Sequence, residues 1–382
     1  MSIGTKMVKG FNWPIIAFFG ITTAGAIVGA PLYVRHFGVS LSEILLCLFF
    51  VVATGLSITV GYHRLYAHSS FRANRFVRFL VLFFGAAAFE QSTLTWSSGH
   101  RDHHRYVDTE LDPYSIKKGF WYAHIGWMTL WKQNPDYNNV KDLLKDKLLM
   151  HQHNYYVLWG FTAGVLIPVL LGALTGHALG ALVFSVCVRL TFVYHATFCI
   201  NSVCHSFGKA TYDVDATAKD HWFAAVLTNG EGYHNFHHRF PTDYRNGVRW
   251  YHWDPSKWVI TFLEKIRFAE GLKRTSLTQI LRAHLAAQKT LASRSLGRTE
   301  VHSRARRILD WNYGLLEKKL HEWETHLAKS RVSGLRASHE LEAKARAAFE
   351  SRRRRWILWT SRVTAFSRTA LNSRPAPGNA VS

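Results

Sequence analysis

The chain of 382 residues is long enough for two or three domains, and it carries a formal net charge of +22. Its basic excess is uneven, because residues 271–382 hold 23 Lys and Arg against 8 Asp and Glu, whereas residues 1–270 hold 24 against 17. The four cysteines form no CxxC pair, which argues against a disulfide framework or a thiolate zinc site. Because the chain also carries apolar segments of membrane length, its charge favours an anionic membrane surface, and no nucleic-acid partner is expected.

Four apolar segments are long enough to cross a bilayer, whose hydrocarbon core takes about twenty helical residues. They are predicted at residues 13–33, 41–62, 155–175 and 181–200. Short links join the first to the second and the third to the fourth, so the segments are expected to form two antiparallel hairpins. Lys6 and Lys9 place the N-terminus on the cytosolic side. Residues 63–154 and 201–270 are then a cytosolic cap, and both termini are cytosolic.

Ionisable groups inside or beside the apolar segments need partners, because charge is costly in a bilayer. The stretch 76–94 is apolar but contains an arginine and Glu90, so it is predicted to lie at the interface or in the cap rather than to span. Arg189 and His195 fall within the fourth span. We expect them to have a structural partner, such as Glu90.

Residues 271–382 differ in composition from residues 1–270, which predicts two domains. The extension is basic and has a helical pattern, and its end from about Ser373 is predicted to be disordered. The run Ser351–Trp359 joins four arginines to two tryptophans. That combination is typical of a segment at an anionic membrane surface.

Histidines form three clusters and a single position, each beside an apolar stretch. The nine residues are His63, His68, His100, His103, His104, His205, His234, His237 and His238. Residues at i, i+3 and i+4 share a helix face, so each HxxHH triplet can offer two or three imidazoles to one point. Neutral imidazole is a common metal ligand. Because the two hairpins return all nine residues to one side, the sequence predicts a single, binuclear metal site.

The spacing of His63 and His68 is different, since residues five apart lie about 140° apart around an α-helix. They can converge only if the helix ends or bends between them, or they serve two metal ions. The second option suits a binuclear centre.

An all-imidazole set of ligands suits iron, copper or zinc. Zinc hydrolases use three protein ligands, far fewer than nine. Two iron ions with four or five nitrogens each account for the count, and such a centre can activate O2. Asn201 lies one helical turn before His205 and could hold a metal-bound water.

The motifs HRLYAH, HRDHH, NSVCH and HNFHH, with DTELDPY and HIGW, resemble the membrane fatty acid desaturase family, close to its Δ9 acyl-CoA branch. The resemblance covers residues 10–270. It implies an all-α integral membrane protein with four transmembrane helices under a cytosolic cap. It also implies a di-iron centre held by the nine histidines, with Asn201 acting through water. The implied reaction uses O2 and two electrons to place a cis double bond, expected at Δ9, in an acyl chain. The nearest alternative is a membrane di-iron hydroxylase acting on an acyl or alkyl chain.

The same resemblance suggests which residues contact the substrate, namely Trp96, Ser98, Arg101, Trp127, Lys132 and Phe198. Two positions depart from the animal acyl-CoA pattern, since Ser98-Gly99 replaces an Arg-Asp pair and Trp131-Lys132 replaces a basic pair. The acyl carrier is therefore left open between CoA, a lipid and another carrier. No HPGG haem motif follows, so the electron donor is expected to be a separate ferredoxin, rubredoxin or cytochrome b5. The expected location is the bacterial inner membrane or the endoplasmic reticulum.

Overall fold

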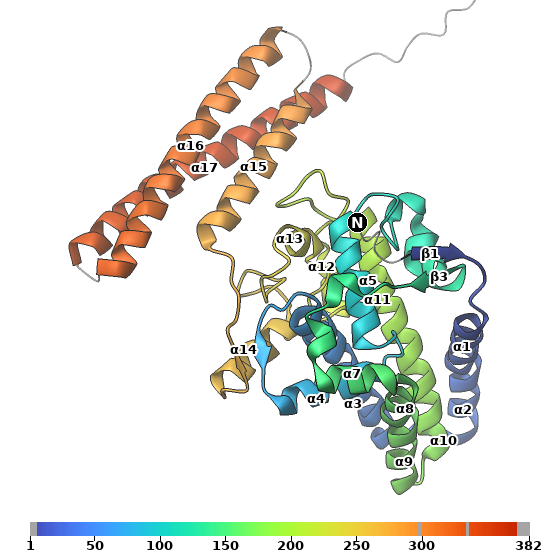
Figure 1. The fold of residues 1–382 in the computed structure, drawn as a ribbon. Coiled ribbons are helices and arrows are strands. Elements are labelled where there is room, and N and C mark those ends of the chain that lie inside the picture. The colour runs from blue at the N-terminus through green and yellow to red at the C-terminus, as the bar shows by residue number, and fades with distance from the viewer. Residues whose placement is uncertain (1–5, 297–299, 334–335, 373–382) are drawn as a thin grey trace, which may run out of the picture. The chain divides into compact units, whose positions relative to one another are not determined.

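The structure is a computed structural model that describes residues 6–296, 300–333 and 336–372, and it is predominantly helical with almost no sheet (Figure 1). The chain divides into two compact units. We call them the membrane unit, which comprises Met1–Lys209 and Ala216–Arg274, and the C-terminal unit, which comprises Ala210–Asp215 and Thr275–Ser382.

Four composite helices of the membrane unit are long and apolar enough to cross a bilayer. The first is α1 (Trp13–Ala24), η1 (Gly25–Gly29) and α2 (Ala30–Phe37), and the second is α3 (Leu41–Leu56) and η2 (Ser57–Ala67). The third is α8 (Tyr156–Phe161), η7 (Thr162–Leu166) and α9 (Ile167–Leu174), and the fourth is α10 (Ala178–Ala181), η8 (Leu182–Val188) and α11 (Arg189–Ser206). Each contains a π-helical segment. The four predicted apolar helices are confirmed, but the second and fourth extend five or six residues further, because they continue into the cap with His63 and His205.

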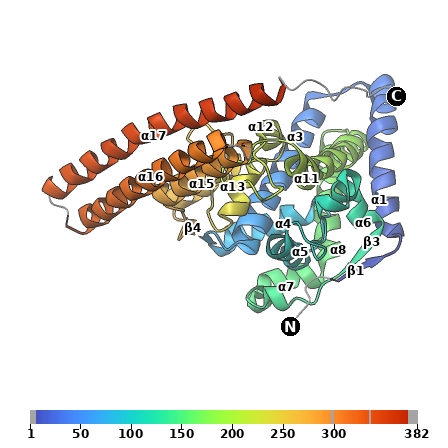
Figure 2. The ribbon, with the colours of Figure 1, turned by 90° about the horizontal axis from the view of Figure 1, so that it is seen from above.

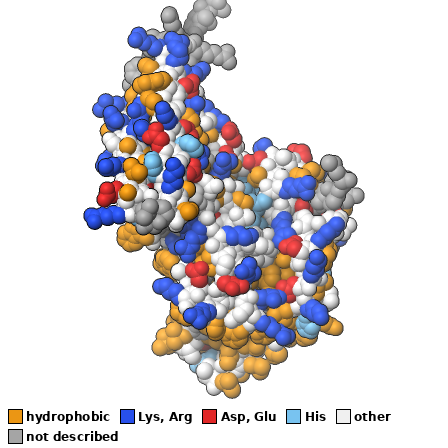
Figure 3. Space-filling view, turned by 60° about the vertical axis from the view of Figure 1, so that its left-hand side comes forward, with side chains coloured by type: hydrophobic (Ala, Val, Ile, Leu, Met, Phe, Trp, Pro, Cys, Tyr) orange, Lys and Arg blue, Asp and Glu red, His pale blue; other side chains and the backbone are white. Residues whose placement is uncertain are grey.

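Tight turns close both helical hairpins. Gly38 has a φ of 73°, and Ser40 then caps α3 in a capping box with Glu43. Gly176, with a φ of 78°, makes the corresponding turn of the second hairpin. The spans present apolar side chains outward, with Leu174 83% exposed. This surface is the almost wholly hydrophobic lower part of the membrane unit in Figure 3.

The remaining elements of the membrane unit form the cap. Its helices are α4 (Arg75–Ala86), α5 (Thr93–Tyr106), η3 (Ile116–Lys118), η4 (Tyr122–Gly126), α6 (Trp127–Thr129), η5 (Asn138–Val140), η6 (Leu143–Lys145), α7 (Lys147–Asn154), α12 (Trp222–Leu227), α13 (His234–Arg239) and α14 (Pro255–Lys265). Two short antiparallel pairs join β1 (Lys6–Lys9) to β3 (Trp131–Asn134) and β2 (Arg72–Ala73) to β4 (Ala269–Glu270). The second pair holds residues 269–270, near the C-terminal end of the membrane unit, beside the start of α4.

As predicted, the stretch 76–94 does not form a helix long enough to span a membrane. Helix α4 ends at Ala86, and Phe89 and Gln91 then adopt left-handed conformations with φ of 56° and 76°. These two residues redirect the chain, and Ser92 caps α5 by accepting a hydrogen bond from the backbone N–H of Thr95. The break therefore sets the direction of the helix that carries the first HxxHH triplet.

The buried Arg189 has partners other than the one expected. Its guanidinium donates to the backbone carbonyls of Ser185, Ala87 and Gly164 and to the hydroxyl of Thr54. These neutral acceptors occupy its donors, and Glu90 lies elsewhere, so the predicted pairing with Glu90 is wrong. His195 instead contacts His124, with Nδ1 and Nε2 3.0 Å apart.

The C-terminal unit consists of α15 (Leu277–Ser295), α16 (Glu300–Ser333) and α17 (Arg336–Asn372), which lie side by side in Figures 1 and 2. Leucines and aromatic residues fill its core, including Leu320 and Phe349, both fully buried. Trp356 belongs to this core, since it is 3% exposed and donates to Gln288. One of the two tryptophans in the run Ser351–Trp359 is thus packed inside and unavailable to a membrane, contrary to expectation. The predicted disordered end, 373–382, lies outside the described residues.

Candidate metal centre and adjoining cavity

Four segments of the membrane unit carry the nine clustered histidines toward one region. Helix α5 carries the first HxxHH triplet and α13 the second, while η2 and the end of α11 carry His63 and His205. The side chains fall into two groups. Within each group, all the ligand atoms lie within 4.8 Å of one another. The first group is His63, His68, His100, His104 and His237, and the second is His103, His205, His234 and His238.

Each HxxHH triplet is divided between the two groups. His100 and His104 point to the first group, whereas His103 between them points to the second. In α13, His234 and His238 share the second group and His237 joins the first. The i, i+4 pairs therefore act together, and each triplet bridges the two candidate positions for an ion.

His63 and His68 lie in the same group, with ring centroids 4.8 Å apart. The interpretation that they serve two ions is therefore wrong, because the helix between them is not an α-helix. In η2 the backbone N–H of His68 bonds to the carbonyl of His63, a spacing of five residues. A π-helical turn is one residue longer than an α-helical turn, so it places residues i and i+5 over one another.

Carboxylates and a hydroxyl face the outer nitrogens of three of the imidazoles. Nδ1 of His63 lies 2.8 Å from Glu231, and Nδ1 of His103 lies 2.9 Å from Asp112. Nδ1 of His205 lies 2.7 Å from the hydroxyl of Thr217, which donates to Asp108. An acceptor at Nδ1 holds the ring proton there and leaves Nε2 as a lone pair aimed inward, which is the arrangement of metal-binding histidines.

Without a bound cation, the second group would be unfavourable, because the lone pairs of its Nε2 atoms face one another. Its Nε2 atoms face each other at 3.0 Å for His205 and His234, 3.0 Å for His234 and His238, and 3.3 Å for His238 and His103. His103 and His205 have their protons on Nδ1, so at most two hydrogens remain, and they cannot serve all three contacts. Nitrogens bound to one ion at about 2.0–2.1 Å and at right angles lie ~3 Å apart. The donor set therefore fits a metal cation.

Burial favours the neutral, ligating form of His100, His104, His234 and His237. Desolvation, reinforced by neighbouring imidazoles, lowers the pKa of His100, His104 and His237 well below the ordinary value. The same causes lower the pKa of His234 to about 3. Desolvation opposes ionisation of Glu231, but His63 and Arg64 outweigh it and lower the pKa of that carboxyl to about 2. The site thus combines neutral ligands with an ionised carboxylate behind them.

A buried ionic network supports the first group from behind. Arg64 pairs with both Glu231 and Asp254 at 3.0 Å and donates to the carbonyl of Tyr244. Asp254 is fully buried and also accepts from three backbone N–H groups, at residues Asn246, Gly247 and Lys257. Residue 64 follows a ligand directly, so this network fixes the backbone beside His63 to the segment that precedes α14.

A cavity of about 370 Å³ adjoins both histidine groups. His63 and His100 of the first group and His103 and His234 of the second form part of its wall. Much of the remaining wall is apolar, with Val51, Val52, Ile58, Phe192, Phe198 and Leu227 among its residues. An apolar cavity that ends at a cluster of imidazoles is suited to a hydrocarbon chain held against a metal.

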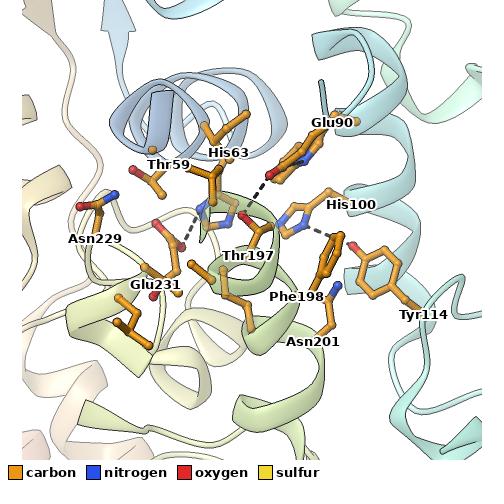
Figure 4. Close-up of a pocket in the computed structure, with 18 of the residues that line it drawn as sticks. Thr59, His63, Glu90, His100, Tyr114, Thr197, Phe198, Asn201, Asn229 and Glu231 are labelled. Carbon is orange, nitrogen blue, oxygen red and sulfur yellow. Dashed lines mark hydrogen bonds and ion pairs between the residues drawn. The ribbon is translucent and has the colours of Figure 1, made fainter. Parts of the chain in front are cut away.

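The residues predicted to contact substrate are found in two places. Trp96, Trp127 and Phe198 line the cavity, as does Asn201, which Figure 4 shows beside Phe198. The other three are absent from its lining. Ser98 is fully buried and bonds to Asn139, and Arg101 bonds to Asp142 and to backbone carbonyls, while Lys132 lies in β3.

Other residues of the site were not predicted. Glu90 lies at the cavity wall, where it accepts hydrogen bonds from Thr197 at 2.9 Å and Trp96 at 3.2 Å (Figure 4). Glu231, Asp112 and Asp108 stand behind the ligands. The last three lie in the motifs GEGYHNFHH and DTELDPY, so carboxylates close in sequence to histidine clusters were the available signal.

Comparison with known proteins agrees with this geometry. Residues 42–260 match the fatty acid desaturase family model. The chain is 36% identical over 329 residues to a probable acyl-CoA desaturase of Schizosaccharomyces pombe, with 85% of this chain and 64% of that protein aligned. It is 36% identical over 315 residues to acyl-CoA desaturase 1 of Saccharomyces cerevisiae, covering 80% and 60% respectively.

A shorter relative is matched over almost its whole length. The chain is 31% identical over 278 residues to an sn-1 stearoyl-lipid 9-desaturase of Anabaena variabilis, with 72% of this chain and 98% of that protein aligned. By contrast, the chain spans less than two thirds of the length of the two yeast proteins. The membrane unit, its two histidine groups and these matches show that the chain belongs to the fatty acid desaturase family.

Proposed function

We propose that the protein is an O2-dependent acyl desaturase that introduces a cis double bond, at Δ9, into a saturated acyl chain. The observation that carries this proposal is the apolar cavity whose wall includes histidines of both groups. A saturated chain in this cavity would lie against two adjacent candidate metal positions. The relatives named as acyl-CoA and stearoyl-lipid 9-desaturases support the substrate class and the bond position.

Two iron ions fit the two groups, with five imidazoles for one and four for the other. When bound, they supply the chemistry that activates O2 and removes two hydrogens from adjacent methylenes, with two electrons from a donor protein. Asn201, at the cavity wall one turn before His205, would reach the metal centre through a water.

The chain's own residues shield the acyl chain from water and orient the imidazoles toward the metal positions. The apolar wall formed by Val51, Ile58 and Phe198 excludes water from the chain. Glu231 and Asp112 hold a proton on Nδ1 of their histidines, so Nε2 faces the metal position. Because Trp96 and Thr197 both donate to the carboxylate of Glu90 at the wall, these residues fix its shape where the acyl chain passes.

The acyl carrier is CoA or a lipid, since relatives of both kinds are similar to this chain. The proposed electron donor is a ferredoxin, a rubredoxin or a cytochrome b5. The membrane is the bacterial inner membrane or the endoplasmic reticulum, with both termini and the metal centre on the cytosolic side. The positions of Lys6 and Lys9 before the first span support this orientation.

The test is expression in a host that lacks its own desaturase, followed by fatty-acid analysis with assignment of double-bond position. We expect a new cis-Δ9 product from the wild type and none above background from His103→Ala. His151→Ala, which changes an exposed histidine of the cap, is the matched control and should retain product. A hydroxylated chain without a new alkene would favour the hydroxylase, and unsaturated product from His103→Ala would refute the ligand assignment.

A further inference from the structure

A second cavity lies in the C-terminal unit, between α16 and α17. Its volume is about 370 Å³. It is lined by Asn312, Leu316, Arg352, Arg355, Trp356, Leu358, Trp359 and Arg362. We call this cavity the arginine groove. Its eight lining residues include three arginines and no carboxylate, so the groove is strongly cationic. The proposed desaturase reaction assigns no role to this groove.

The charges of the arginine groove are not neutralised within the chain. Among the described residues, no ion pair includes Arg352, Arg355 or Arg362, whereas neighbouring Arg353 pairs with Glu350 at 3.0 Å. The Nε atom of Arg352 is buried and has no hydrogen-bond partner in the described part of the chain. Arg355 and Arg362 are exposed and Arg352 is partly exposed, so an external anion can reach their guanidinium groups.

The arginines of the groove are spaced so that they lie on one face of α17. Arg352, Arg355 and Arg362 are separated by three and seven residues, with Trp359 between the last two, so all four lie on one face of α17. Residues 351–363 contain five arginines and no acidic residue. Figure 3 shows many further Lys and Arg side chains on the visible face of this unit. The surrounding field therefore attracts anions to the groove.

Apolar groups stand beside the charges. Trp356 and Leu316 form a buried floor, while Leu358 is 61% exposed. Trp311 is 65% exposed, and the guanidinium of Arg352 lies over its ring at 5.8 Å. Guanidinium groups bind phosphate oxygens through paired N–H donors, and tryptophan is favoured where headgroups meet acyl chains. A ligand that is anionic at one end and apolar next to it matches both features.

We propose that the arginine groove binds the phosphate headgroup of an anionic phospholipid in the membrane. Arg352, Arg355 and Arg362 receive the phosphate, and Leu358 and Trp359 contact the adjoining glycerol and upper acyl carbons. The groove thereby attaches the C-terminal unit to an anionic bilayer, independently of the desaturase reaction.

The test uses the full-length chain in nanodiscs and follows hydrogen–deuterium exchange of residues 351–363. Discs of phosphatidylcholine are compared with discs that also contain phosphatidylglycerol. We expect exchange to slow severalfold when phosphatidylglycerol is present and to recover in high salt. Each basic residue at such a surface contributes about a fivefold gain in affinity, so three together contribute on the order of 100-fold. The triple variant Arg352→Gln, Arg355→Gln, Arg362→Gln should therefore lose protection in every mixture up to equimolar.

The control removes the same charge from other exposed arginines of the two helices, as Arg304→Gln, Arg307→Gln and Arg354→Gln. It should keep most of the protection, and both triple variants should show wild-type exchange around Leu320 as evidence of folding. Glycerol phosphate and polyglutamate, added to phosphatidylcholine discs, represent a free anion and an acidic protein. The proposal is overturned by equal exchange in both kinds of disc, by equal loss in the two triple variants, or by protection from either soluble anion but not from lipid.

Discussion

The two units of this chain bury opposite kinds of side chain. Arg64 and Arg189 are the largest fully buried residues of the membrane unit, while its apolar spans are exposed. In the C-terminal unit, Leu320, Trp323 and Trp356 are buried in the core, and no arginine is fully buried among the described residues. The first unit is therefore arranged for a bilayer around a polar centre, and the second for water around an apolar centre.

This difference determines which interactions contribute most to the folding stability of each unit. A buried charge without its partner is strongly destabilising, so each member of the network behind the histidines is needed for the others. The C-terminal unit depends on apolar packing, and its ion pairs are screened by solvent. Matched substitutions in the two units should therefore have very different effects.

The largest effect is expected for Asp254→Ala. The substitution removes one of the two carboxylates that pair with Arg64, and the acceptor of three backbone N–H groups, in a fully buried position. We expect unfolding of the membrane unit to become easier by about 3–5 kcal/mol, measured by thermal unfolding in detergent. Asp254→Asn keeps the volume but offers one acceptor in place of two, so it should recover less than half of the loss. Full stability of Asp254→Asn would show that volume, not charge, matters here.

A comparable loss of about 2–5 kcal/mol is expected for Leu320→Ala, but only in the C-terminal unit. Leu320 is fully buried among leucines and aromatic residues. Hydrogen exchange along α15–α17 should accelerate, while desaturation stays within about twofold of wild type, because the membrane unit has its own core. Leu341→Ala, on an exposed face of α17, serves as control. Parallel loss of activity would show that the two units are coupled.

A pH-dependent effect of about 3 kcal/mol is expected at Glu90. Burial raises the pKa of this carboxyl from its ordinary 4.5 to about 7. The folded chain therefore holds a proton that the unfolded chain has released, so the contribution to stability is complete below pH 4.5 and is lost as the pH rises through 7. Glu90→Gln stays neutral, and its unfolding free energy should change less than that of the wild type between these limits. Identical pH profiles would mean that Glu90 is ionised in the fold.

The smallest effect is expected for Glu324→Ala in the C-terminal unit. Glu324 accepts from Arg282 at 2.9 Å, and each side chain is about a third exposed, at 35% and 36%. Exposed pairs of this kind contribute about 0–1 kcal/mol, and less in high salt. Chemical unfolding of the unit at two salt concentrations measures this. A salt-independent loss as large as that of Asp254→Ala would remove the distinction between the units.

The sequence by itself determined the architecture and the ligand candidates. Runs of about twenty apolar residues are sufficient to identify four spans, because the bilayer sets the length that a helix needs. The HxxHH triplets fall on helices α5 and α13, where the i, i+4 rule holds, so the pairing of His100 with His104 and of His234 with His238 follows from local geometry.

Only the tertiary structure decided how those ligands are divided and supported. His63 and His68 share a group because η2 is a π-helix, and a widened turn of this kind depends on packing around the helix rather than on a sequence pattern. Arg189 bonds to Ala87 and Gly164, carbonyls brought from distant segments. Glu231 reaches His63 across 168 positions of the chain. Contacts between residues so far apart are set by the fold as a whole. The sequence shows that Glu231 lies near a histidine cluster, but not which imidazole it faces.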